Sequence, residues 1–72
     1  MKLSELRKEC CQALREIGHP SEPEIVYHHL WDKYHSPVAP LVRVRQALED
    51  MVECSSIRLV SEGIYDLWRK AG

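Results

Sequence analysis

The chain has 72 residues, of which 44% are hydrophobic and 29% are charged, and its formal net charge is −1. This is the composition of one small folded domain, and it argues against intrinsic disorder. No segment approaches the ~20 consecutive apolar residues that a membrane span needs, and the charged first residues do not resemble a secretory signal, so we expect no membrane partner.

The first predicted element is a helix over residues 4–17, with Ser4 in position to cap it. Apolar side chains recur there at the spacing of one helix face, namely at Leu6, Cys10, Leu14 and Ile17. Gly18 suits the left-handed conformation that ends many helices, and Pro20 prevents the helix from continuing. We therefore expect this helix to pack through one face and to expose the other.

A second helix is predicted over residues 22–34, from a capping signature at its start. Ser21 and Glu24 have the spacing of a capping box, in which each side chain accepts a hydrogen bond from the backbone N–H of the other residue. Pro23 fits the first turn, because its missing N–H would have no partner there. The buried face is predicted to contain Ile25, Val26, His29, Leu30 and Tyr34.

A third helix is predicted over residues 40–54. Pro37 and Pro40 bar a continuous helix across the segment that separates it from the second one. Its core stripe is predicted to contain Leu41, Val44, Leu48 and Met51. Its outward face is charged and polar, with Arg43, Gln46, Glu49, Asp50 and Glu53. Arg45 lies at the border of the two faces, one helical turn before Glu49, with which it is spaced to pair.

The last third of the chain changes to the alternation that is typical of strands. Residues 57–60 and 64–68 are rich in β-branched and aromatic side chains, and Gly63 lies in the turn between them. Alternation places Ile57 and Leu59 on one face, and it leaves open which face is buried. Since two strands alone are marginal in water, they must pack on the helices. We therefore predict one α+β domain over residues 1–72, with three helices followed by a two-stranded antiparallel hairpin at about 57–68.

The last helix and the hairpin resemble the recognition helix and wing of a winged-helix-turn-helix domain. The resemblance is carried by the run from Val42 to Met51, by residues 57–60, and by Gly63, Tyr65 and Leu67. Residues 58–68 are also similar to the HARE-type helix-turn-helix modules of chromatin proteins and to the small winged helices of some histone acetyltransferases. The resemblance covers most of the chain and is more specific for the fold than for the subfamily.

The resemblance implies DNA binding, in a gene-regulatory or chromatin protein that is nuclear if its source is eukaryotic. In this family the third helix enters the major groove through its N-terminal half. The matching positions in this sequence are Val42, Arg43, Arg45 and Gln46. Arginine can pair with guanine there, and glutamine with adenine. Phosphate contacts are expected from cations outside that part of the helix, namely Arg58, Lys33, and Arg69 or Lys70.

Several acidic residues depart from the pattern of a DNA-binding wing. Such wings usually carry lysine or arginine at the tip, whereas this tip contains Glu62. Glu49 and its neighbours in the second half of the third helix would also repel phosphate, and phosphate contacts depend on lysine and arginine. The alternative is a protein-interaction winged helix without nucleic-acid contact, which docks through Tyr27, Trp31 and Val42. An RNA-binding winged helix is a third alternative.

The sequence does not indicate catalysis, a cofactor or a metal. The sequence contains three cysteines, Cys10, Cys11 and Cys54. Their odd number and their spacing do not match a secreted disulfide framework, so we expect an intracellular protein. There is no Cys-x-x-Cys pair, and His28 and His29 are adjacent, so that they point in different directions on a helix. Since no nucleophile-and-base set and no glycine-rich phosphate loop is recognisable, we expect neither an enzyme nor a small-molecule substrate.

Overall fold

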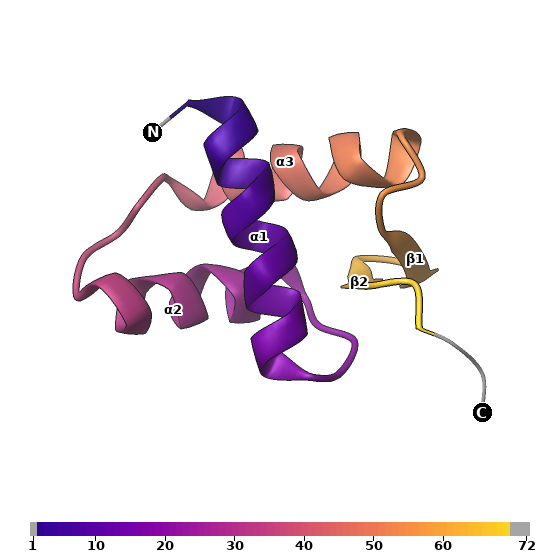
Figure 1. Cartoon of the computed structure of the whole chain (residues 1–72), viewed down its shortest axis with the longest axis horizontal. Helices are drawn as coiled ribbons and strands as arrows, with labels where there is room; N and C mark the ends of the chain where they lie inside the picture. Colours follow the sequence, from indigo (N-terminus) through magenta and orange to yellow (C-terminus); the bar gives the residue numbers. More distant parts are fainter. Residues whose placement is uncertain (1, 70–72) are drawn as a thin grey trace.

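Three helices and then two strands make up the protein, as a computed structural model that describes residues 2–69. The helices are α1 (Leu3–Ile17), α2 (Pro23–Tyr34) and α3 (Leu41–Glu53), and the strands are β1 (Arg58–Ser61) and β2 (Ile64–Asp66). The strands form an antiparallel hairpin (Figure 1). This confirms the predicted α+β architecture of three helices followed by a two-stranded antiparallel hairpin, and we call the hairpin the wing. None of the helices within residues 2–69 is both long enough and apolar enough to span a membrane.

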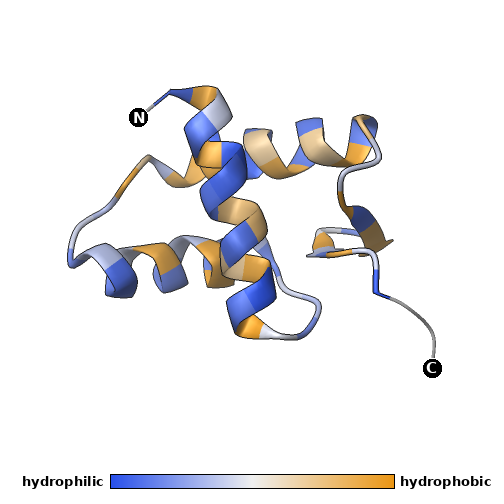
Figure 2. Ribbon diagram, in the orientation of Figure 1, coloured by the Kyte–Doolittle hydropathy of each residue, from blue (hydrophilic) through white to orange (hydrophobic). Residues whose placement is uncertain are grey.

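The core lies between the three helices because each carries one apolar stripe. Figure 2 shows apolar and polar residues alternating around each helix, as expected for helices that are buried on one face. Fully buried leucines come from all three helices, namely Leu6, Leu14, Leu30 and Leu48. Ile57 and Tyr65 extend the same core toward the hairpin.

The end of α1 agrees with the prediction, and its start differs by one residue. Gly18 adopts a φ of 85°, and its N–H donates to the Leu14 carbonyl at 3.1 Å. The helix begins at Leu3, and Lys2 takes the N-cap position without a side-chain hydrogen bond. Ser4 therefore lies inside the helix and does not cap it.

The capping box predicted at the start of α2 is wrong. Glu22 takes the N-cap position, and it makes no capping hydrogen bond through its side chain. The Ser21 hydroxyl donates instead to the His19 carbonyl at 3.0 Å. The Ser21 backbone pairs with Tyr65 in both directions, at 2.8 and 2.9 Å. The bridge ties the loop between α1 and α2 to β2, and pairing with the wing has displaced the local cap.

The buried stripe of α2 is narrower than predicted. Val26 and Leu30 are fully buried, whereas Ile25 and Tyr34 are exposed. His29 is only partly buried, and its Nε2 forms a hydrogen bond with a carboxylate of α1. A short helix that contacts two others along one edge leaves these positions at the surface.

The prediction that Ile57 and Leu59 share a face is also wrong. Ile57 is buried, whereas Leu59 is 50% exposed. Ile57 belongs to the turn that closes α3, where its N–H approaches the Met51 carbonyl at 3.4 Å, so strand alternation begins only after it. Within the hairpin, Leu59 pairs with Tyr65, and a bulge at Val60 interrupts the register.

Glu16 connects the end of α1 to the second half of α2. One carboxylate oxygen lies 2.9 Å from His29 Nε2, and the other accepts a hydrogen bond from Lys33 Nζ at 3.2 Å. The hydrogen bond with His29, followed by those with Lys33 and Gln12, lowers the pKa of Glu16 from 4.5 to about 2. The contact therefore depends on an ionised carboxylate.

Protonation of Glu16 is expected to loosen this contact in acid. Because the pKa is lower in the folded chain than in the unfolded chain, the contact stabilises fully above pH 4.5 and stops doing so as the pH falls toward about 2. The urea midpoint of Glu16→Gln should lie below that of the parent at about pH 6 and approach it at about pH 2–3. A gap between the two midpoints that is equal at both pH values would contradict this role.

Candidate binding groove

The exposed face of α3 carries the four residues that are predicted to read DNA bases. Val42 is 69% exposed, and Arg43, Arg45 and Gln46 are also exposed. The Arg43 side chain makes no hydrogen bond or ion pair with the described part of the chain. Helical periodicity therefore predicted the outward orientation of Arg43 and Gln46 correctly, and Arg45, which was predicted at the border of the two faces, is exposed as well.

Two of these side chains are already engaged by acidic residues. Arg45 Nη2 lies 3.2 Å from Glu24 Oε1, so that it joins α3 to α2. The predicted pair with Glu49 inside α3 is not formed. Gln46 donates to Asp50 Oδ1 at 2.9 Å. A base or phosphate would have to compete with these contacts.

The predicted phosphate-binding cations do not gather on one face. Lys33 lies in the last turn of α2, which Figure 1 shows at the opposite end of the longest axis from the wing. Its ammonium group is 3.2 Å from a carboxylate oxygen of α1. Arg58 begins β1 and is exposed. Lys70 lies outside the described residues.

The residues predicted for a protein interface lie on two helices. Tyr27 and Trp31 meet edge to face on α2, with ring centroids 5.7 Å apart, and Trp31 is exposed. Val42 is on α3. Trp68 is exposed as well, but its indole N–H donates to the Ser55 carbonyl at 2.9 Å. That bond holds the segment after β2 against the turn after α3.

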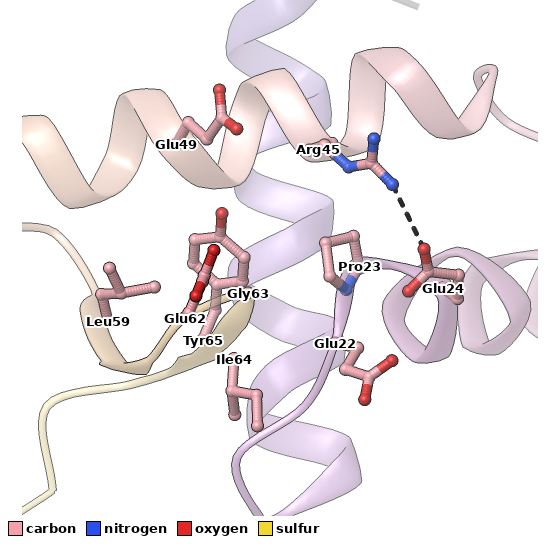
Figure 3. A pocket seen from close by; sticks show the side chains of 10 residues that line it. All are labelled: Glu22, Pro23, Glu24, Arg45, Glu49, Leu59, Glu62, Gly63, Ile64 and Tyr65. Atoms are coloured by element: carbon pink, nitrogen blue, oxygen red, sulfur yellow. Dashed lines mark hydrogen bonds and ion pairs between the residues drawn. The ribbon is translucent and has the colours of Figure 1, made fainter.

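A hollow of about 640 Å³ lies between α3, the start of α2 and the hairpin (Figure 3). We name it the α3–wing groove, and its lining residues are Glu22, Pro23, Glu24, Arg45, Glu49, Leu59, Glu62, Gly63, Ile64 and Tyr65. The Ser21–Tyr65 bridge sets the start of α2 beside β2, which forms one side of this groove. Its volume falls in the range of about 300–1,000 Å³ that is typical of ligand pockets.

The α3–wing groove is acidic. Four glutamates line it, whereas Arg45 is the one cation among the described residues that do so. Because Arg45 pairs with Glu24, three lining carboxylates are left without a cation of the groove. They come from different elements: Glu22 precedes α2, Glu49 lies on α3, and Glu62 lies in the hairpin turn.

Tyr65 is nearly buried and presents its hydroxyl to this groove. Its side chain is 6% exposed, and Figure 3 shows the hydroxyl pointing toward α3. This hydroxyl has no hydrogen-bond partner among residues 2–69. Burial first, and then the charge of Glu49, raise the pKa of Tyr65 above 10.0, while Arg45 opposes this effect. The hydroxyl is therefore neutral near pH 7 and can both donate and accept a hydrogen bond.

Sequence reasoning did not assemble this groove. Glu49 and Glu62 were recognised as acids that disfavour phosphate, and not as parts of one site. Tyr65 was assigned to the hairpin without a burial side. One sequence feature could have indicated the groove: acidic residues occur both at the tip of the wing and on the outer face of the third helix.

The cysteines do not add a nucleophile to the groove. Burial raises the pKa of Cys10 to about 12, so this thiol stays protonated inside the core. Cys54 is exposed at the C-terminal end of α3 and does not line the groove. Within residues 2–69, no three His, Cys, Asp or Glu side chains are grouped so that they could hold a metal ion. The groove offers charge, apolar contact and a phenolic hydroxyl, which are means of binding.

Comparisons of this chain with protein-family models, with curated proteins and with solved structures give no significant match.

Proposed function

We propose that this chain is a non-enzymatic winged-helix module that binds another protein. The observation that carries the proposal is the charge of the α3–wing groove, in which three carboxylates lack a lining cation. A winged helix that reads DNA brings its third helix and wing to the nucleic acid, and its affinity depends on lysine and arginine contacts with phosphate. Carboxylates in this place repel DNA, whereas a protein partner can offer complementary groups.

Exposed apolar side chains on α2, α3 and β1 also support a protein partner. Trp31 and Val42 are exposed on α2 and α3, and Leu59 and Val60 are exposed on β1. Aromatic side chains are enriched in protein interfaces, and they often carry much of the binding energy. Tyr27 packs against Trp31 and the core, which holds the indole in place.

DNA binding is the second candidate function, and the exposed first half of α3 favours it. Arg43 is exposed and unpaired within residues 2–69, and Arg58 is exposed on the wing. With Val42, Gln46 and an Arg45 that has left Glu24, these side chains could contact bases and phosphates. Nuclear localisation in a eukaryotic source and a role in transcription or chromatin belong to this second candidate.

Site-specific photocrosslinking in cells of the source organism distinguishes the two candidates. A photoreactive amino acid replaces Val42, and a control variant carries it at Glu5, an exposed position on α1 outside the groove. We expect position 42 to give adducts that protease removes and nuclease leaves intact, and the control position to give few. Adducts that nuclease removes would overturn the proposal.

A DNA titration gives the complementary measurement. We expect no micromolar binding of labelled duplex or single-stranded DNA by fluorescence anisotropy, even at low salt, where electrostatic attraction is strongest. Micromolar binding that weakens with added salt and with the double substitution Arg43→Ala/Arg45→Ala would instead support the second candidate.

A further inference from the structure

We infer that the α3–wing groove binds a basic segment of the partner protein, an extended peptide that places lysine or arginine side chains among Glu49, Glu62 and Tyr65. This inference rests on the proposed function, and it narrows the partner from any protein to one chemical class of segment. Charge, the unpartnered hydroxyl of a nearly buried tyrosine and an apolar lining point to it separately.

The placement of the carboxylates favours more than one cation in the ligand. Glu22, Glu49 and Glu62 come from three separate parts of the chain around one hollow, and none has a cation of the lining as partner. One exposed ion pair contributes little to binding. A segment with several lysine or arginine residues can pair with several carboxylates at once, and its affinity should fall as salt screens these charges.

The hydroxyl of Tyr65 is the second and independent indication of a ligand. Its side chain is more than nine-tenths buried, the hydroxyl lines the groove, and it has no hydrogen-bond partner within residues 2–69. Such a hydroxyl needs a new hydrogen-bond partner once a ligand that enters the groove displaces water from it. A peptide can satisfy this group fully, since an ammonium or guanidinium donates to the phenolic oxygen and a peptide carbonyl accepts from its hydrogen.

The apolar part of the lining favours a side chain with an aliphatic stem. Pro23, Leu59 and Ile64 line the groove beside the carboxylates. The stems of lysine and arginine pack on apolar surface while their charged ends stay near water or counter-charges. The hollow, at about 640 Å³, also has room for several residues of an extended peptide.

Fluorescence anisotropy with the purified chain tests this inference. The probe is a short fluorescein-labelled peptide of alternating arginine and leucine, and its matched control carries glutamate in place of arginine. We expect only the basic peptide to bind, and to bind more weakly at higher salt. Glu49→Gln and Glu62→Gln should each weaken binding by about twofold to fivefold, whereas the same charge change in Glu5→Gln should leave it unchanged.

Two further variants test the geometry of the groove. Tyr65→Phe should weaken binding while leaving thermal stability unchanged, since the hydroxyl has no partner in the free chain. Arg45→Gln frees Glu24 and should strengthen binding of the basic peptide, whereas the same substitution would weaken binding to DNA.

Three outcomes would overturn the inference. The first is that Glu5→Gln weakens peptide binding as much as the groove variants do, which would mean that the overall charge of the chain attracts the basic peptide. The second is absence of peptide binding while position 42 still gives protein adducts, which would leave the proposed function standing. The third combines two results: nuclease removes the photocrosslinked adducts at position 42, and Arg45→Gln weakens binding to DNA. This outcome would overturn the proposed function as well.

Discussion

Replacement of Leu48 by alanine is expected to lower the free energy of unfolding by about 2–5 kcal/mol. Leu48 is fully buried in α3 and belongs to the core cluster to which all three helices contribute. The cost combines the lost transfer of methyl groups out of water with a cavity that the surrounding side chains fill only in part. Since a chain of this length has roughly 4–11 kcal/mol of stability in total, the variant should lie close to unfolding.

Urea denaturation followed by circular dichroism measures this effect. Val42→Ala is the matched control, because it truncates an exposed side chain of the same helix and should change stability by no more than about 0.5 kcal/mol. Leu30→Ala should fall in the same range as Leu48→Ala, because Leu30 is buried in the same cluster from α2. A cost for Leu48→Ala of well under about 1 kcal/mol would place the core elsewhere.

The fold could be predicted wherever one element decides its own structure. Gly18 ends α1 because its own backbone conformation allows the left-handed turn, and the apolar stripes of α1 and α3 follow from spacing within each helix. Ser21 behaves differently. It looks like a helix cap in its local sequence, but its backbone pairs with Tyr65 near the other end of the chain. The local sequence around Ser21 does not indicate that its backbone pairs with β2 while its side chain leaves α2 uncapped.

The candidate groove could be predicted only in part, for the same reason. Helical spacing placed Arg45 at the border of the outward face, but the choice of Glu24 over Glu49 as its partner depends on how α2 packs beside α3. Glu49 and Glu62 are recognisable as surface acids from the sequence, whereas their shared groove depends on the packing of the wing. The chemistry of single residues could therefore be predicted from the sequence, whereas their combination in one groove could not.

Asp66 and Arg69 form an ion pair that sequence reasoning did not anticipate, and its loss should have the second large effect. The Asp66 carboxylate is 1% exposed and accepts hydrogen bonds from Arg69 Nε and Nη2, both at 2.9 Å, and from the Leu67 N–H at 2.8 Å. Arg69→Gln would leave this buried charge with one donor. Because the Arg69 side chain is 41% exposed, water can partly replace it, and we expect the urea midpoint of the variant to lie clearly below that of the parent.

The pH dependence of that cost separates charge from packing. The hydrogen bonds from Arg69 hold the pKa of Asp66 below its ordinary value of 3.8, so the pair stabilises fully above that pH and stops doing so as the pH falls through the lowered pKa. The urea-measured cost of Arg69→Gln should therefore be full at about pH 6 and shrink below about pH 4. In an Asp66→Asn background the same substitution should cost little at any pH, because no buried carboxylate remains to lose its partner. A cost that is unchanged in acid and in that background would mean that Arg69 acts through the packing of its stem, and that the buried carboxylate is satisfied without it.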